Sequence, residues 1–317
     1  KACGRLKSIE IGEEIHAELS KQGLLERNVV LCTALVDMYI SCDALTKAQK
    51  AFDQIREPDA VLWTLLISGY ANSGLGDKAL KLFQQMHEQG LAPDAVTFAC
   101  TLKACSSMGM IWKGETIHLR CRNQGFLEKH IMLGNALVDM YAKCGALSKA
   151  REVFDELLVP DIVSWNALLT GYSQHGQSNE VFGLFNLLID QGILPNGVTF
   201  LVLLSACSHG GLVEEGDLCF HWMDIVCGVK PTPEHYTCLV DLFGRAGQFH
   251  KTMIVIENVS PSDRFSSWVS LLGSCQKWEK MELGRWAFEN LVHLNAKYAG
   301  SYVSINNIYA TSNVDLS

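Results

Sequence analysis

The chain repeats itself at a fixed interval of 102 residues, and this repetition constrains its fold more than any other feature. The stretch Ala34-Leu-Val-Asp-Met-Tyr39 recurs without change as Ala136-Leu-Val-Asp-Met-Tyr141, and Trp63 corresponds to Trp165 at the same spacing. A third, weaker copy carries Ala206-Cys207 at the position of Ala104-Cys105. So many matches at one offset indicate an array of similar structural units.

Each 102-residue period divides into three units of 31, 35 and 36 residues. A truncated long unit, 1–28, comes first, and two segments that depart from the repeat, 264–297 and 298–317, come last. The seven complete units are expected at 29–59, 60–94, 95–130, 131–161, 162–196, 197–232 and 233–263.

Each unit has the sequence pattern of two helices joined by a tight turn. In the unit 162–196, the first helix is expected from about Trp165 to Gln174, and Gly176 interrupts it. The second is expected over 178–191, where apolar residues recur at i, i+3, i+4 and i+7. A single hairpin cannot bury the apolar face that these residues form, whereas stacked hairpins can. The pattern therefore predicts an all-α fold, a right-handed superhelical solenoid of stacked helical hairpins.

Composition narrows the functional classes. With 26 Lys and Arg against 34 Asp and Glu, the net charge of −8 argues against binding nucleic acid mainly through bulk charge. The apolar runs are much shorter than the roughly 20 residues of a membrane-spanning helix, so we expect no membrane association. The 12 cysteines include no Cys-x-x-Cys pair, which favours reduced packing residues over a metal site or a disulfide framework. We expect no cofactor and no bound metal. Because the chain begins at Lys1, we also expect a piece of a longer protein.

Several phrases in the units resemble one known family. Hairpins of this length that end in Gly90-Leu-Ala-Pro-Asp94 are similar to pentatricopeptide repeats. The mixture of unit lengths, with Asn135-Ala-Leu-Val-Asp-Met-Tyr-Ala-Lys-Cys-Gly145, resembles the plant subclass that alternates long and short repeats. Residues 264–297, with Trp268-Val-Ser-Leu-Leu-Gly-Ser-Cys275, resemble the E motif of that subclass, and 298–317 resemble the start of a second one. The resemblance implies a role in C-to-U editing of organellar RNA.

The resemblance also implies how single-stranded RNA is bound, at one base per repeat. In the family, the fifth residue of a repeat and its last residue together read the base edge. Five pairs of short polar residues occupy these positions: Thr33 with Asp59, Thr64 with Asp94, Asn135 with Asp161, Asn166 with Asn196, and Thr237 with Asp263. Helix N-capping is the alternative interpretation, because Thr, Asn and Asp are all common caps, and both roles can coexist.

Two further contacts with RNA are implied in the same way. In the family, the apolar second residue packs on the flat faces of neighbouring bases, and ordinary packing is the alternative, above all for Met132. The residues at this position are Val30, Val61, Met132 and Val163, whereas the last short unit has Glu234 instead. The thirteenth residue often contacts phosphate, a role available here only to Lys143 and Arg245.

Some units depart from the reading pattern. The fifth residues of the two complete long units, Ala99 and Leu201, cannot make a side-chain hydrogen bond to a base, so we expect those units to read weakly. Asp43 stands where the equivalent unit has Gly145 between its helices, which predicts a distorted first complete unit. By the family's pairing rule, the RNA register along the seven units is G, G, any, U, pyrimidine, any, G.

The chain itself is not expected to be an enzyme. A cytidine deaminase requires His-x-Glu together with Cys-x-x-Cys to hold a zinc-bound water. His16-Ala-Glu18 matches the first half, but no Cys-x-x-Cys exists, so His16 is interpreted as a packing or surface residue. A deaminase would follow Ser317 in a longer protein or be recruited in trans, together with accessory proteins, by residues 264–317.

The leading hypothesis is therefore a sequence-specific single-stranded RNA-binding protein of the mitochondrion or chloroplast that specifies a site for C-to-U editing, with no DNA partner. A second hypothesis keeps the RNA binding but assigns stabilisation, splicing or translation of a transcript. A third is a tetratricopeptide-like scaffold that binds a peptide in its groove, which the acidic balance favours slightly and the in-phase polar pairs disfavour.

Overall fold

The computed structural model describes residues 9–25 and 28–314, and these residues form helices with no strand among them. Residues 1–8 and 26–27 of the truncated long unit and residues 315–317 of the last segment lie outside this description. The α-helices are α2 (Ile9–Lys21), α3 (Val29–Ser41), α4 (Leu45–Phe52), α5 (Ala60–Asn72), α6 (Gly76–Glu88), α7 (Ala95–Ser107), α8 (Ile111–Asn123), α9 (Ile131–Lys143), α10 (Leu147–Asp155), α11 (Ile162–Gln174), α12 (Ser178–Asp190), α13 (Gly197–Gly210), α14 (Val213–Ile225), α15 (Pro233–Arg245), α16 (Phe249–Asn258), α17 (Phe265–Lys277), α18 (Met281–Leu294) and α19 (Ala299–Val314).

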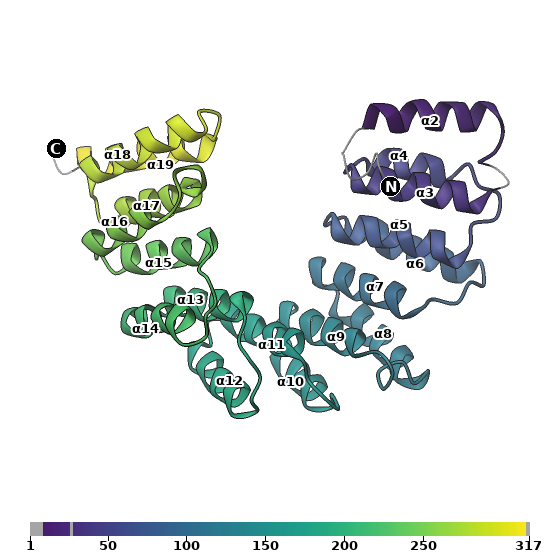
Figure 1. Cartoon of the computed structure of the whole chain (residues 1–317), viewed down its shortest axis with the longest axis horizontal. Coiled ribbons are helices and arrows are strands. Elements are labelled where there is room, and N and C mark those ends of the chain that lie inside the picture. The colour runs from purple at the N-terminus through teal and green to yellow at the C-terminus, as the bar shows by residue number, and fades with distance from the viewer. Residues whose placement is uncertain (1–8, 26–27, 315–317) are drawn as a thin grey trace. The chain divides into compact units, whose positions relative to one another are not determined.

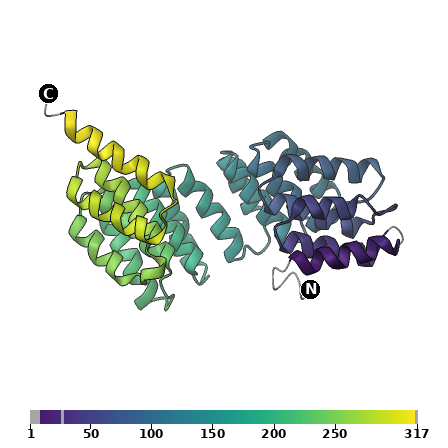
Figure 2. The same cartoon turned by 90° about the horizontal axis from the view of Figure 1, so that it is seen from above.

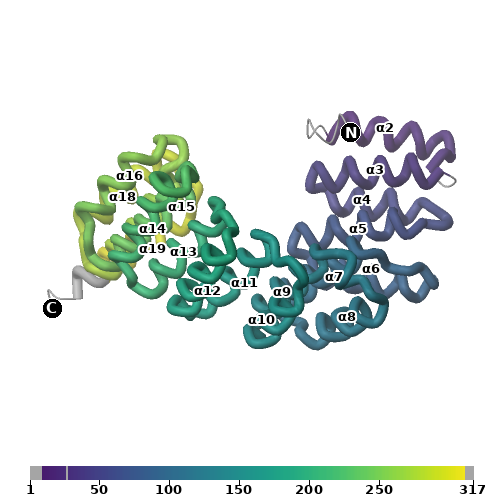
Figure 3. Tube along the Cα trace, turned by 60° about the horizontal axis from the view of Figure 1, so that its bottom comes forward, coloured from purple at the N-terminus to yellow at the C-terminus, as the bar shows by residue number. Residues whose placement is uncertain are grey.

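The helices form two compact units, residues 1–160 and 161–317. In the first unit, α2 is followed by four hairpins, from α3–α4 to α9–α10, stacked in chain order (Figures 1 and 3). In the second unit, four hairpins, from α11–α12 to α17–α18, are stacked in the same way, and α19 packs on α17 and α18 (Figures 1 and 2). The expected all-α class of stacked helical hairpins is thereby confirmed.

The two helices of a hairpin have different roles in the stack. Within each unit, the first helix of a hairpin contacts the first helix of the next, as α5 contacts α7, and the second helix packs against both. The first helices are accordingly apolar on several sides, and α5 buries Trp63, Leu66, Ile67 and Tyr70 together. At about 1.5–3 kcal/mol for each large buried side chain, this packing between neighbours stabilises a stack that no hairpin could form alone.

The turn inside the hairpins is retained where glycine is missing. Gly145 links α9 to α10 with φ 79°, in the left-handed region that glycine adopts without strain. Asp43, its equivalent between α3 and α4, takes the same region with φ 56°. The expected distortion of the first complete unit is therefore wrong, because aspartate tolerates this conformation better than most residues.

The start of one helix differs from its sequence-based boundary. Helix α11 begins at Ile162 rather than near Trp165, because Asp161 caps it. At the C-terminal end, Trp268, Leu272, Leu291 and Ile308 form a core shared by α17, α18 and α19, so these helices continue the fold beyond the last short unit. No helix in the described ranges is long and apolar enough to cross a membrane.

Candidate nucleic-acid interface

The start of each first helix presents a capping residue, an apolar second residue and a fifth residue in a fixed arrangement. Four of the five predicted repeat-end readers are helix N-caps whose side-chain oxygen accepts a hydrogen bond from the amide of the third helical residue. The distances from these oxygens to the amides are 2.9 Å for Asp59, 2.7 Å for Asp94, 2.9 Å for Asp161 and 3.1 Å for Asn196. The capping interpretation is therefore right for these four residues.

Asp263 differs from the other repeat-end residues. It lies in a short 3₁₀ turn, Pro261–Asp263, and accepts hydrogen bonds from the hydroxyls of Ser260 and Ser262 at 2.5 and 3.3 Å. Helix α17 has Arg264 at its N-cap, without a side-chain capping bond. The structure thus does not give Asp263 the position that the other four share, because the insertion of the turn shifts the start of the helix.

The predicted fifth-residue readers stand at the fifth position of helices α3, α5, α9, α11 and α15. Thr64 is 9% exposed, and Asn135 and Asn166 are 8% exposed each, whereas Thr33 and Thr237 are more accessible. A base could therefore meet only the outer edge of the first three side chains. For Thr64 and Asn166, the next hairpin covers one side of the fifth residue, since Thr97 lies 2.6 Å from the Thr64 hydroxyl and Thr199 lies 2.8 Å from Asn166 Oδ1.

Hydrogen bonds join two of the predicted pairs. The amide of Asn166 donates to Asn196 Oδ1 at 3.1 Å. Thr64 and Asp94 are joined through Thr97, whose hydroxyl lies 2.6 Å from that of Thr64 and donates to Asp94 Oδ1 at 2.7 Å. In both pairs, the reader of one repeat is therefore tied to the cap of the next first helix.

The second helical residues form a series of exposed apolar side chains. Val30, Val61, Met132 and Val163 are between 43 and 77% exposed, so ordinary core packing does not account for them. Sequence reasoning missed two members of the series, Val96 of α7 and Val198 of α13, which are also exposed. Their position in the period was the signal that could have found them, although they belong to the long units that lack a polar fifth residue.

The two predicted phosphate ligands already have anionic partners. Lys143 forms an ion pair with Asp139 at 2.8 Å, and Arg245 forms one with Asp241 at the same distance. Both pairs join residues i and i+4 on a helix surface, where such interactions contribute only a few tenths of a kcal/mol. A phosphate could displace either carboxylate at little cost.

His16 is held by packing contacts, as the sequence suggested. Its Nδ1 lies 2.9 Å from the Tyr39 hydroxyl, and its equivalent His118 makes the same contact with Tyr141 at 3.0 Å. Burial lowers the pKa of His118 and raises that of Tyr141 to about 12, so the phenol donates to a neutral imidazole. In the third copy of the repeat, phenylalanines replace both partners, at 220 and 243.

Within the described residues, no group of three or more His, Cys, Asp or Glu could hold a metal ion.

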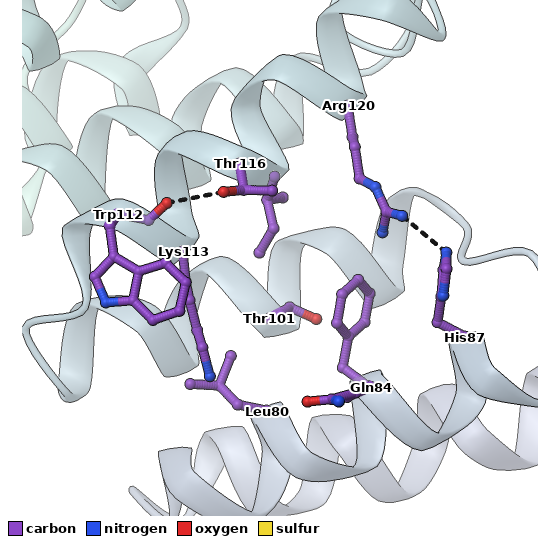
Figure 4. Close-up of a pocket in the computed structure, with 10 residues that line it drawn as sticks. Leu80, Gln84, His87, Thr101, Trp112, Lys113, Thr116 and Arg120 are labelled. Carbon is purple, nitrogen blue, oxygen red and sulfur yellow. Dashed lines mark hydrogen bonds between the residues drawn. The ribbon is translucent and has the colours of Figure 1, made fainter.

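A cavity in the first unit lies away from the predicted readers. It holds about 200 Å³ and is formed by α6, α7 and α8 (Figure 4). Trp112 and Lys113 lie at one end, and Arg120 contacts His87 Nε2 at 2.8 Å at the other. None of the predicted base-reading residues lines it, so we place the candidate interface on the first helices and not here.

Comparison with known families identifies part of the array. Residues 58–107 and 160–209 match a PPR repeat family, and residues 135–159 match the PPR repeat itself. Among curated proteins, a pentatricopeptide repeat-containing protein of Arabidopsis thaliana is 40% identical over 309 residues, covering 97% of this chain and 42% of the relative. A second from the same plant is 36% identical over 318 residues, covering 99% of this chain and 54% of the relative. A third, whose name places it in the mitochondrion, is 35% identical over 316 residues, covering 99% and 52%. The chain thus spans about half the length of these relatives, or less.

Solved structures with the same fold are also known. The pentatricopeptide repeat protein PPR10 in complex with an 18-nucleotide psaJ RNA element superposes with a TM-score of 0.70 at 17% identity, covering 95% of this chain and 45% of that one. PPR10 from maize gives a TM-score of 0.52 at 19% identity, covering 99% and 50%. At this identity the likeness shows the fold alone, a helical repeat solenoid.

Proposed function

Because this chain is a pentatricopeptide-repeat protein, we propose that it binds single-stranded RNA in a sequence-dependent manner along the starts of its first helices. One observation carries the proposal: exposed apolar second residues and polar fifth residues recur in phase at the same helix starts. Further support comes from PPR10, which has the same fold and has been solved with bound RNA.

The residues divide the task between stacking and hydrogen bonding. The series from Val30 to Val163 offers apolar contact to base faces, which favours binding without distinguishing bases. The polar pairs then meet the base edges, where a wrong base costs about 1–3 kcal/mol by analogy with base contacts in DNA. With Ala99 and Leu201 at the fifth position, the long units contribute stacking through Val96 and Val198 but no side-chain base reading.

Electrostatics contributes little to this binding. If only Lys143 and Arg245 neutralise phosphates, the slope of log K against log salt is about −1.4, from a factor of roughly 0.7 for each contact with a single strand. The net charge of −8 opposes any stronger dependence. Measurement of affinity between about 50 and 300 mM salt tests this expectation, and a slope steeper than about −4 would show that backbone charge dominates binding.

A gel-shift assay with two RNAs tests base reading directly. One RNA carries the register G, G, any, U, pyrimidine, any, G, and the other has the same bases in scrambled order. Tighter binding to the first supports the proposal, whereas equal binding to both contradicts it. A protein scaffold that binds peptides would bind neither RNA, so the same assay separates that alternative.

The substitution Asn135→Thr tests the register. Asn with Asp161 favours uracil by the family's rule, and Thr with the same Asp favours guanine. The variant should therefore prefer G over U at the fourth base, with the other positions unchanged. If the preference at that base stays with U, the assignment of this pair to that base is wrong.

We further propose that the RNA is an organellar transcript, in the mitochondrion or chloroplast, and that binding specifies a C-to-U editing site. Residues 264–317 resemble E motifs, and the segment 265–314 carries exposed aromatic side chains, including Trp278, Trp286 and Tyr302, that could contact a deaminase or an accessory protein. Sequencing of organellar transcripts in a loss-of-function plant tests this step. Loss of conversion at one cytidine supports it, and no lost conversion leaves a stabilisation, splicing or translation role.

A further inference from the structure

The type of residue at the third position of each first helix correlates with the type at the fifth position of the preceding repeat. Where the preceding repeat has a polar reader, the third residue is usually a hydroxyl residue. Thr97, Ser164, Thr199 and Ser267 follow the readers Thr64, Asn135, Asn166 and Thr237, respectively. Where the preceding repeat has no reader, as with Ala99 and Leu201, the third residue is Leu133 or His235. The one exception is Leu62, which follows Thr33.

Thr97 shows what this hydroxyl does. It is fully buried, its amide and hydroxyl both donate to Asp94 Oδ1 at 2.7 Å, and its oxygen lies 2.6 Å from the Thr64 hydroxyl. An ionised carboxylate only accepts hydrogen bonds, so the proton of Thr97 is directed to Asp94. The contact with Thr64 then requires the proton of Thr64. Thr64 is left with lone pairs alone for any other partner.

Thr199 contacts the asparagine reader Asn166 from the corresponding position, but here the hydroxyl donates to the reader. It is also fully buried, and its oxygen accepts from the backbone amide of Asn196 at 3.1 Å. Its hydroxyl donates to Asn166 Oδ1 at 2.8 Å, which is closer than the other acceptor within reach, Asn196 Oδ1 at 3.2 Å. The amide nitrogen of Asn166 donates to Asn196 Oδ1 at 3.1 Å. Both bonds fix which way the Asn166 amide points. The second amide proton of Asn166 remains for an outside partner.

We propose that the hydroxyl at the third position of the following repeat is a specificity-determining positioning residue for the base reader of the preceding repeat. This inference rests on the proposed RNA binding, and it explains how one reader presents a hydrogen-bond acceptor while another presents a donor. Thr97 makes Thr64 an acceptor, and Thr199 makes Asn166 a donor. Beside Thr64, the carboxylate of Asp94 adds further acceptors, and guanine presents two adjacent donors, N1–H and the N2 amino group.

The remaining threonine readers fit the same scheme through a different partner. Thr33 donates its proton to Val29 O at 2.8 Å, and Thr237 donates to Pro233 O at 2.9 Å. Thr33 therefore presents an acceptor without a hydroxyl at position 62, which accounts for the exception. Ser267 is 3.4 Å from Thr237, so it contributes less there than Thr97 does for Thr64.

Binding of RNAs that differ only at the second base of the register tests the proposal. The variant Thr97→Val keeps the shape and the backbone amide but removes the hydroxyl, and Thr97→Ser restores it. Thr101→Val is the matched control, because Thr101 is an equally buried hydroxyl of α7 that donates to Thr97 O at 2.6 Å and does not contact Thr64. Thermal unfolding of each variant is measured alongside. Should Thr97→Val not fold, Thr199→Val and Thr199→Ser, read at the fifth base, replace the pair.

The expected result is a preference for G over A of about tenfold in the unchanged protein, Thr97→Ser and Thr101→Val, falling below about threefold in Thr97→Val. For the position-199 pair, the corresponding result is loss of the pyrimidine preference in Thr199→Val only. An unchanged preference in the valine variant, an equal loss in valine and serine variants, or a loss in Thr101→Val would overturn the inference while RNA binding stands. If the unchanged protein shows no base preference, base reading fails, and this inference fails with it.

Discussion

Asp94 has two roles at the start of α7 that a pair of substitutions can separate. Its Oδ1 accepts from the amide and the hydroxyl of Thr97, which caps the helix, and its carboxylate is a predicted base reader. An asparagine in its place would retain an oxygen for the cap but would turn an amide group outward, whereas an alanine would remove the acceptor altogether. Stability measurements on Asp94→Asn and Asp94→Ala therefore report the capping role, and the RNA preference of the two variants reports the base-reading role.

The magnitudes follow from the burial of Thr97. In Asp94→Ala, the amide and the hydroxyl of a fully buried threonine lose their acceptor, at a cost of about 1–3 kcal/mol. In Asp94→Asn, only the attraction between the carboxylate and the helix N-terminus is lost, which contributes about 0.3–1 kcal/mol. The control is Asp77→Asn, an exposed acid in the first turn of α6 that is not a predicted reader, with an expected cost below about 0.5 kcal/mol.

Amide hydrogen exchange at Thr97 reports the cap locally, where global unfolding of a repeat protein does not. We expect the exchange of this amide to accelerate at least about fivefold in Asp94→Ala and less than that in Asp94→Asn. In RNA binding, Asp94→Asn should move the preference at the second base from guanine towards adenine, whose edge presents one donor and one acceptor. Asp77→Asn should leave that preference unchanged.

Two results would refute this reasoning. If Asp94→Asn accelerates exchange as much as Asp94→Ala, the side-chain oxygen is not the group that caps α7. If Asp94→Asn keeps the guanine preference while the cap behaves as expected, the outward atoms of residue 94 do not meet the base.

Three further predictions concern packing, stacking and ionisation. Gly76→Ala should destabilise the protein by about 1–3 kcal/mol in chemical denaturation, because a Cβ there would lie 2.9 Å from the backbone oxygen of Ala104; Gly183→Ala, in open space on α12, should instead stabilise it by up to about 1 kcal/mol. Val61→Ala should weaken RNA binding about threefold in the gel shift while changing the free energy of unfolding by less than about 0.5 kcal/mol, since Val61 is largely exposed, and a larger stability loss would indicate packing instead. Burial raises the pKa of Cys105 to about 12, so stability should be intact below the ordinary thiol pKa of about 8.5 and fall as pH rises from there towards 12, where the unfolded thiol is ionised and the folded one is not; denaturation between about pH 7 and 10.5 should show a shallower fall for Cys105→Ala.

Much of the fold could be predicted because it is built from local, repeated patterns. The 102-residue offset determined the phase of the helices, so the fifth residues were assigned correctly to helix starts. The start of α11 was placed too late, since Trp165 marks its buried face whereas Asp161 marks its cap. Asp263 continues the spacing of the other repeat ends but lies in a 3₁₀ turn, so its local geometry could not be predicted from that spacing.

Contacts between repeats could not be predicted from the pattern inside one repeat. The bond between Thr64 and Thr97 joins residues 33 positions apart, and so does the bond between Asn166 and Thr199. From the sequence of a single repeat, the hydroxyls of Thr97 and Thr199 could be interpreted only as parts of a capping box. The small exposed fraction of the fifth residues follows from the same contacts, and it too was not apparent from the sequence.

The two complete long units lack a polar fifth residue and also lack a hydroxyl at the third position of the next first helix. At α7 the fifth residue is Ala99, and the first helix of the next hairpin, α9, has the apolar Leu133 at the third position, where α7, α11, α13 and α17 have a hydroxyl. At α13 the fifth residue is Leu201, and His235 occupies the corresponding place; its Nδ1 lies 3.1 Å from the Thr232 amide that donates to it, and its Nε2 donates to Gly197 O at 2.7 Å. The reader and its anchor are thus absent together, in both units. A polar fifth residue added alone would find no partner on the next first helix to fix its orientation, so the weak reading expected of the long units would depend on a pair of positions in adjacent repeats and not on one residue.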